Sequence, residues 1–190
     1  MFEQKEKCMK QKIWAKTLLA SYNSLETIAN AVDNLVVSQG INSANNHLTT
    51  IENAERIINL IQRKKLLVNL KVLVDSTVAK LDNLSARLII MRYLDNIKPD
   101  ICLEILKLSR RTYFRRLDRA LDEFSLKLKL SGYTPDVLEQ LVQKEYWIKE
   151  HYNNFLKQEL QKIEKERTKI IGATQQFFSF GKFAECNATN

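Results

Sequence analysis

Hydrophobic and polar side chains alternate with the period of an α-helix along most of this chain. Between Glu3 and Val37, small and apolar residues recur three or four positions apart, as in a heptad stripe. The members of this stripe are Ala15, Leu18, Tyr22, Leu25, Ala29, Val32 and Val36. A polar segment from Ser38 to His47, which contains Gly40, should end the helix. The spacing therefore predicts one long helix over about residues 3–37.

A second long helix is predicted to follow, from residue 50 to about Leu81. Residues 49–52, Thr-Thr-Ile-Glu, are typical of a capping box, in which a threonine oxygen and a glutamate satisfy free backbone N–H groups. Six residues of this helix are expected to face inward: Ile51, Ile58, Ile61, Leu70, Leu73 and Val78. Asn83 or Ser85 should cap the next helix, whose expected core residues are Leu88, Ile89 and 91–94.

Residues 100–121 predict two short helices joined by a tight turn. The segment from Asn96 to Pro99 should end the preceding helix, because proline disfavours helical backbone in the residue before it. The first short helix is expected to bury one face, formed by Ile101, Ile105 and Leu108. Ser109 is placed to cap the second helix. The inward stripe of that helix consists of Tyr113, Leu117, Ala120, Leu121, Phe124 and Leu128.

The second short helix carries five arginines, which makes it the candidate functional element. Arginine binds phosphates strongly and can form two parallel hydrogen bonds with guanine. We expect Arg110, Arg111 and Arg115 to contact bases or phosphates, and Phe114 to pack against a thymine methyl group. Phosphate contacts are also expected for Lys107, Arg116 and Arg119. Many such turns contain glycine, so Lys107 is expected to need a positive φ.

From about Asn69 to Leu128, the chain resembles the C-terminal helix-turn-helix (region 4) of sigma-70-type factors. It is closer to phage late-gene transcriptional regulators of the ArpU type. The resemblance lies in residues 81–94, LDNLSARLIIMRYL, and 105–121, ILKLSRRTYFRRLDRAL. It implies that these residues lie in or beside the major groove: Ser109, Arg110, Arg111, Thr112, Phe114 and Arg115. Nothing like a promoter-melting region is visible in residues 1–65, which favours a free-standing regulator over an initiating sigma subunit.

The C-terminal third predicts a further helix. Residues 131–133 are typical of a turn, and Thr134-Pro135-Asp136 is typical of a helix start. This helix should run to about Ile171, with an apolar side formed by Leu141, Ile148, Tyr152, Phe155 and Ile163. Residues 177–183 are aromatic and expected to be irregular, either as a docking peptide or folded back on the bundle.

Composition supports an all-α fold. Only 4 Gly and 2 Pro occur in 190 residues, whereas an all-β fold needs many turns. We expect three segments: two long helices in 1–81, a helix-turn-helix domain in 82–130, and a long helix with an aromatic tail in 131–190. The long terminal helices must bury their stripes. They either form a bundle within one chain or act as the dimerisation arm of a homodimer.

The net charge of +8 favours an acidic partner, such as nucleic acid or an anionic membrane surface. No apolar run is long enough to span a membrane, and no signal peptide is visible, so a cytoplasmic protein is expected. Three scattered cysteines fit reduced thiols.

No catalytic, cofactor or metal pattern stands out in the sequence. His47 and His151 have no metal-ligand pattern near them. Four glutamates are expected to be surface charges: Glu55, Glu139, Glu145 and Glu150. Residues 63–65, Arg-Lys-Lys, either contact flanking phosphates or form a solvated helix face, and Trp14 and Trp147 are expected to be core anchors.

The sequence thus predicts a non-enzymatic, sequence-specific regulator of transcription that binds duplex DNA. Two alternatives stay open: a helical interaction factor that binds RNA polymerase or a sigma factor, and a phage protein that handles DNA without sequence preference.

Overall fold

The computed structural model describes residues 2–41 and 49–185 and divides into two compact units, Met1–Tyr152 and Asn153–Asn190. The described residues form helices joined by short turns, with no strand. The helices are α1 (Phe2–Ile41), α2 (Thr50–Val78), α3 (Asn83–Ile89), the π-helical segment η2 (Ile90–Leu94), α4 (Pro99–Leu106), α5 (Arg110–Leu130), α6 (Pro135–Leu141) and α7 (Tyr146–Glu185). The prediction of an all-α fold is confirmed for this part of the chain.

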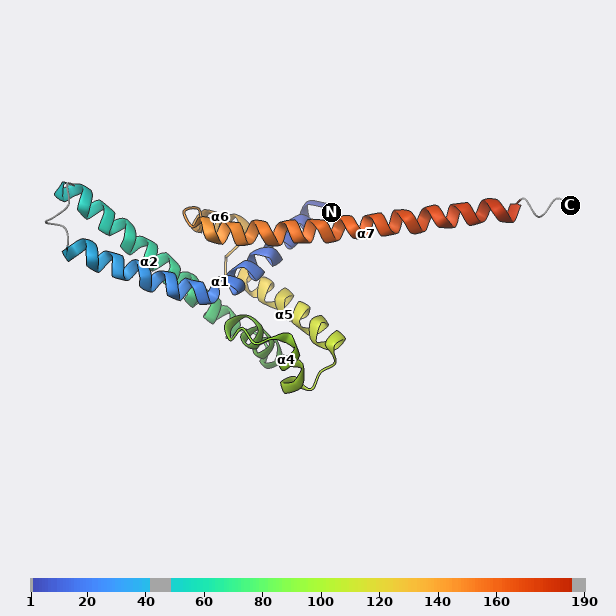
Figure 1. Cartoon of the computed structure of the whole chain (residues 1–190), viewed down its shortest axis with the longest axis horizontal. Coiled ribbons are helices and arrows are strands. Elements are labelled where there is room, and N and C mark those ends of the chain that lie inside the picture. Colours follow the sequence, from blue (N-terminus) through green and yellow to red (C-terminus); the bar gives the residue numbers. More distant parts are fainter. Residues whose placement is uncertain (1, 42–48, 186–190) are drawn as a thin grey trace. The chain divides into compact units, whose positions relative to one another are not determined.

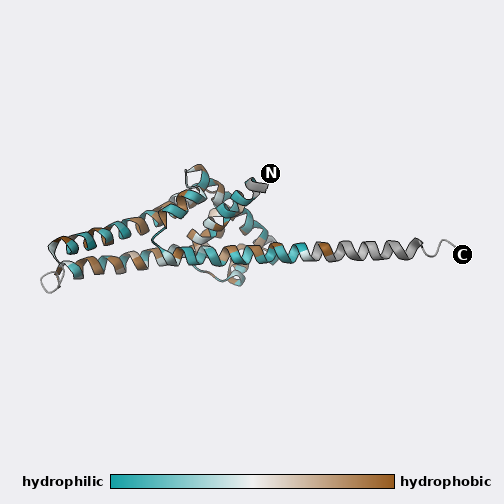
Figure 2. Ribbon diagram, turned by 90° about the horizontal axis from the view of Figure 1, so that it is seen from above, coloured by the Kyte–Doolittle hydropathy of each residue, from teal (hydrophilic) through white to brown (hydrophobic). Residues whose placement is uncertain are grey.

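Helices α1 and α2 pack side by side as an antiparallel hairpin (Figure 1). The predicted stripe of α1 faces inward: Ala15, Leu18, Leu25, Ala29 and Val32 are buried, and Tyr22 and Val36 are half-buried. Both helices alternate hydrophobic and hydrophilic residues along their length (Figure 2). The capping box of α2 is also confirmed, because Thr49 Oγ1 accepts a hydrogen bond from Glu52 N at 3.3 Å while Thr49 N donates to Glu52 Oε2 at 2.8 Å.

The inward face of α2 differs from the prediction in its first half. Leu70, Leu73 and Val78 are buried as expected. However, Ile51, Ile58 and Ile61 are 73%, 52% and 49% exposed. They were assigned to the core because they recur at helical spacing, but α2 carries two such stripes and only one of them faces α1. The buried stripe runs through Leu67, Leu70, Val74 and Thr77.

The helices from α3 to α5 enclose a small core of their own. Its buried members are Leu88, Met91, Cys102, Tyr113 and Leu117. Asp82 caps α3, with its Oδ1 accepting a hydrogen bond from Ser85 N, so the predicted caps Asn83 and Ser85 were one and three residues too late. The helix ends in η2, after which Asn96 takes a left-handed conformation with φ 53°.

The main core is built from residues of α1, α2, α3, α5, α6 and the start of α7, so all three segments expected from the sequence contribute to it. Trp14 is 2% exposed and stacks on Tyr152 with ring centroids 4.3 Å apart. The whole predicted stripe of α5 is buried: Tyr113, Leu117, Ala120, Leu121, Phe124 and Leu128. Ala120, which has no bulk beyond Cβ, is fully buried in this core.

The C-terminal region begins with the predicted turn, in which Gly132 has φ 89°. The single helix expected after it is wrong, because α6 ends at Leu141 and α7 begins at Tyr146. The intervening segment brings Val142 and Glu145 into the interior. Ile163, expected on the apolar side of the helix, is 36% exposed. Residues 177–183 are helical, as part of α7, and not irregular as expected.

Among the described residues, no helix combines the length and the apolar character that a membrane span requires.

Candidate nucleic-acid interface

The turn between α4 and α5 is tight and well defined. Lys107 ends α4 in a left-handed conformation with φ 50° and ψ 44°, as expected for a non-glycine residue at this place. Leu108 N donates to Leu103 O at 3.2 Å and Lys107 N donates to Glu104 O at 3.3 Å, which is the Schellman pattern. Ser109 then caps α5, with its Oγ accepting from Thr112 N at 3.3 Å. The two helices are therefore held at a fixed angle by three consecutive turn residues.

The nine residues expected to contact DNA all lie at the surface of this turn and of the first turns of α5. Seven are exposed and two, Thr112 and Arg116, are half-buried. The seven exposed residues are Lys107, Ser109, Arg110, Arg111, Phe114, Arg115 and Arg119. The first turns of α5 lie beside α4 and away from the α1–α2 hairpin (Figure 1). The structure thus brings the predicted residues together on one accessible surface, which we call the α5 basic surface.

No described residue neutralises the charges of this surface. None of its six basic side chains forms an ion pair with a described residue, although basic residues elsewhere do, as Lys12, Arg63, Lys64 and Lys71 show. Arg110 and Arg111 also occupy the first turn of α5, where the helix dipole disfavours cations. Unpaired cations at this end of a helix weaken the fold slightly, which favours a role in binding anions.

Two carboxylates on α5 form ion pairs with a lysine of α1, which offsets their negative charge near the α5 basic surface. Lys12 Nζ lies 2.8 Å from Asp118 Oδ1 and 2.7 Å from Asp122 Oδ1. Partial burial lowers the pKa of Lys12, but hydrogen bonds to both carboxylates outweigh this effect and raise it. Lys12 is distant in sequence from both aspartates, so these pairs could not be predicted from local spacing.

Phe114 is the one large apolar side chain in the α5 basic surface, and it is 44% exposed. Its ring stands edge-on to the buried Tyr113 ring, with centroids 5.2 Å apart. The Arg110 guanidinium lies 6.0 Å from the Phe114 ring centroid. These contacts fix the orientation of the Phe114 ring, whose exposed edge lies among the arginines of the α5 basic surface.

The face of α4 that packs on α5 was predicted incorrectly. Ile101 and Ile105 are 47% and 48% exposed, and Leu108 is half-buried. Cys102 is fully buried instead, and Leu103 and Leu106 pack against the same small core, as does Leu108, which was expected there. The periodicity of the helix was right, but the face was rotated by about one residue. An exposed pair of isoleucines therefore remains on α4.

The second basic cluster, residues 63–65, is largely committed to intramolecular pairs. Arg63 forms a two-pronged ion pair with Glu145, with Nε 2.7 Å from Oε1 and Nη2 3.0 Å from Oε2. Lys64 Nζ pairs with Asp33. Hydrogen bonding to Glu145 raises the pKa of the Arg63 guanidinium. These two side chains are therefore poor candidates for phosphate contacts.

Glu145 is 1% exposed, which corrects its assignment as a surface charge. Besides Arg63, it accepts a hydrogen bond from the indole Nε1 of Trp147 at 2.9 Å. The other three glutamates of that group, Glu55, Glu139 and Glu150, are exposed as expected. The buried position of Glu145 results from the break between α6 and α7, for which the sequence carries no glycine or proline signal.

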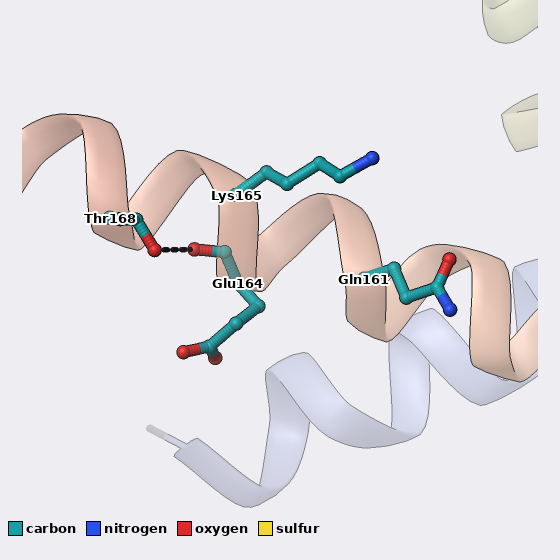
Figure 3. A pocket seen from close by; sticks show the side chains of 4 residues that line it. All are labelled: Gln161, Glu164, Lys165 and Thr168. Carbon is teal, nitrogen blue, oxygen red and sulfur yellow. Dashed lines mark hydrogen bonds between the residues drawn. The ribbon is translucent and has the colours of Figure 1, made fainter.

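No enclosed ligand cavity accompanies these features in the described part of the chain. In the second unit, Gln161, Glu164, Lys165 and Thr168 line an open groove on α7, where Thr168 Oγ1 donates to the backbone carbonyl of Glu164 at 2.9 Å (Figure 3). No group of metal-ligating side chains occurs among the residues that were placed. His151 is exposed and stands edge-on to Trp147, whereas His47 lies outside the described residues.

The chain matches no protein-family model, and it has no significant match among curated proteins or solved structures.

Proposed function

We propose that this protein binds duplex DNA by placing the first turns of α5 in the major groove, and that it regulates transcription as a sequence-specific DNA-binding protein. The observation that carries the proposal is the α5 basic surface, with six cations that lack ion-pair partners among the described residues, directly after a tight inter-helix turn. Helix-turn-helix proteins read bases with the N-terminal residues of the second helix. The resemblance to sigma region 4 and to ArpU-type regulators supports the same reading.

The residues divide into two groups in this proposal. Arg110, Arg111 and Arg115 reach base edges or the nearest phosphates, and the exposed edge of Phe114 packs against a thymine methyl group. The second group holds the phosphate backbone: Lys107, Arg116 and Arg119. The free N–H groups at the start of α5 add to the attraction of a phosphate.

The test is the salt dependence of DNA binding. If six phosphates are neutralised, log affinity falls against log salt concentration with a slope of about −5. Replacing Arg110, Arg111 and Arg115 with Ala together should reduce DNA affinity and reduce the magnitude of that slope by up to about 2.7, the full value applying when all three contact phosphates. The control replaces Arg56, Lys127 and Lys129 with Ala, which removes the same charge from positions outside the α5 basic surface. Equal effects of the two triple variants, or no effect of either, would refute the proposal.

Sequence specificity is tested by selecting duplexes from a random pool at rising salt. A shared short motif supports a regulator, and its symmetry reports whether two copies bind. Equal retention of unrelated duplexes would instead support the non-specific DNA-handling alternative.

The interaction-factor alternative is favoured by one observation, the exposed Ile101 and Ile105 on α4. In that case the protein binds RNA polymerase or a sigma factor through apolar contacts. Replacing both isoleucines with Glu should then abolish co-purification of polymerase, and the triple Arg variant should leave it intact.

A further inference from the structure

The outward side of α2 carries an apolar stripe that nothing in the described chain covers. Its members are spaced alternately three and four residues apart, as the a and d positions of a coiled coil are. They are Ile51, Ala54, Ile58, Ile61, Lys65, Val68 and Val72, and all seven are exposed. We call this set the outer stripe. Because the opposite stripe of α2 already packs on α1, the outer stripe is available to a second helix.

We propose that the outer stripe pairs with the outer stripe of a second copy of this chain, running antiparallel about a two-fold axis beside residues 59 and 60. In this register, Ile58 faces Ile61 of the second copy and Ile51 faces Val68 of the second copy. A two-fold axis makes each of these contacts occur twice, as an isologous interface requires. Four large aliphatic side chains, Ile51, Ile58, Ile61 and Val68, thus each find an apolar partner, and Val72 lies beyond the paired segment.

The single charged member of the outer stripe decides the direction of pairing. In the antiparallel register, Lys65 lies opposite the small side chain of Ala54 and next to Glu55 of the second copy. Neither Lys65 nor Glu55 has an ion-pair partner among the described residues, whereas Lys64 and Lys71 of the same helix pair with α1. A parallel pairing would instead place Lys65 against Lys65, and like charges at facing positions repel.

The first test is the oligomeric state of the full chain, measured by sedimentation equilibrium over a wide concentration range. The unchanged protein should dimerise, and Ile61→Glu should weaken the dimer by at least about tenfold, since it places a charge near the centre of the interface. Leu35→Glu is the matched control, because Leu35 is also 49% exposed and lies on α1 of the same hairpin, outside the outer stripe. Circular dichroism spectra check that both variants stay folded. A protein that is monomeric at every concentration, or equal weakening by both variants, would overturn the proposal.

A second test addresses the register through charge reversal. Lys65→Glu and Glu55→Lys should each weaken self-association, because each places like charges opposite one another. Mixing the two single variants should produce a heterodimer stronger than either homodimer, since both cross-chain pairs are then attractive. Parallel pairing predicts no weakening by Lys65→Glu alone, because residue 65 would face residue 65 and one like-charge pair would replace another, while residues 55 and 65 would lie about 15 Å apart along the helices. Unchanged self-association of Lys65→Glu, or absence of the heterodimer, would therefore overturn the antiparallel register. Both tests can succeed or fail whether or not the protein binds DNA.

Discussion

Replacing Arg63 and replacing Glu145, the two partners of one ion pair, should cost unequal amounts of stability. The Glu145 side chain is 1% exposed, whereas that of Arg63 is 41% exposed. Removing the glutamate charge leaves a guanidinium that water can still reach. Removing the guanidinium leaves a carboxylate sealed in the interior, with Trp147 Nε1 as its remaining donor. We therefore expect Arg63→Met to destabilise the fold more than Glu145→Gln.

The magnitudes follow from the burial of each partner. Breaking a buried pair costs about 3–5 kcal/mol when an uncompensated charge remains inside, and we expect about 3 kcal/mol for Arg63→Met because Trp147 still donates. For Glu145→Gln we expect about 1–1.5 kcal/mol, since charge-assisted hydrogen bonds become neutral ones and the exposed guanidinium is rehydrated. In the double variant both charges are gone, so its cost should be less than the sum of the two single costs.

The assay is urea denaturation followed by tryptophan fluorescence, because Trp14 and Trp147 both belong to the first unit. The free energies of unfolding of the unchanged protein, the two single variants and the double variant complete a thermodynamic cycle. If Glu145→Gln costs as much as Arg63→Met or more, burial of the carboxylate is not the dominant effect and the reasoning is wrong.

Three further predictions concern the small core, the α2 cap and the turn. The Tyr113 hydroxyl is buried and makes no well-formed hydrogen bond with a described residue. Burial, together with the neighbouring Cys102 thiol, raises its pKa to about 12, and Tyr113→Phe should change the free energy of unfolding at pH 7 by less than about 1 kcal/mol. Because the folded pKa of Tyr113 is raised, its contribution to the free energy of unfolding is complete below a pH of about 10 and is lost as the pH rises toward 12. Tyr113→Phe should therefore lose less stability than the unchanged protein over that range. Equal losses in the two proteins would contradict this. Thr49→Ala should lower the protection of the first-turn amides of α2 against hydrogen exchange several-fold, measured relative to the intrinsic exchange rate at the same pH. Acidification should lower that protection in the unchanged protein too, since hydrogen bonds from Thr49 lower the pKa of Glu52 and this stabilisation disappears as the pH falls through that pKa. Equal protection in both proteins would show that the cap is unimportant. Lys107→Gly should raise the free energy of unfolding by about 0.5 kcal/mol, because glycine accepts a positive φ. The same variant should reduce the magnitude of the DNA salt slope by about 0.9. A loss of stability in thermal melts would contradict the first expectation.

Local signals in the sequence were sufficient for most helix boundaries. The capping box at Thr49, the cap at Ser109 and the positive φ at Lys107 each depend on residues only a few positions apart, so they could be predicted without the fold. The predicted inward stripe of α5 is confirmed at every position, because this helix has a single strongly apolar face and only that face can be buried favourably. The exposed positions of the α5 basic surface follow from the same stripe.

The errors arose where more than one apolar face was available. On α2, two heptad stripes compete, and only the position of α1 decides which is buried. On α4, Ile101 and Ile105 form as regular a face as Cys102 and its neighbours, and packing against α5 selects the latter. The break before Tyr146 was missed because it contains neither glycine nor proline.

The helical character of the chain, the ends of most helices and the concentration of cations at the start of α5 all follow from local sequence. These properties depend on backbone hydrogen bonds and side-chain spacing within a few residues. Which charges stay free depends on the fold instead, because the partners of Lys12 and Arg63 are distant in sequence. The tertiary structure pairs those two residues internally and leaves the α5 basic surface and the outer stripe uncovered, since burial and ion pairing depend on how the helices pack.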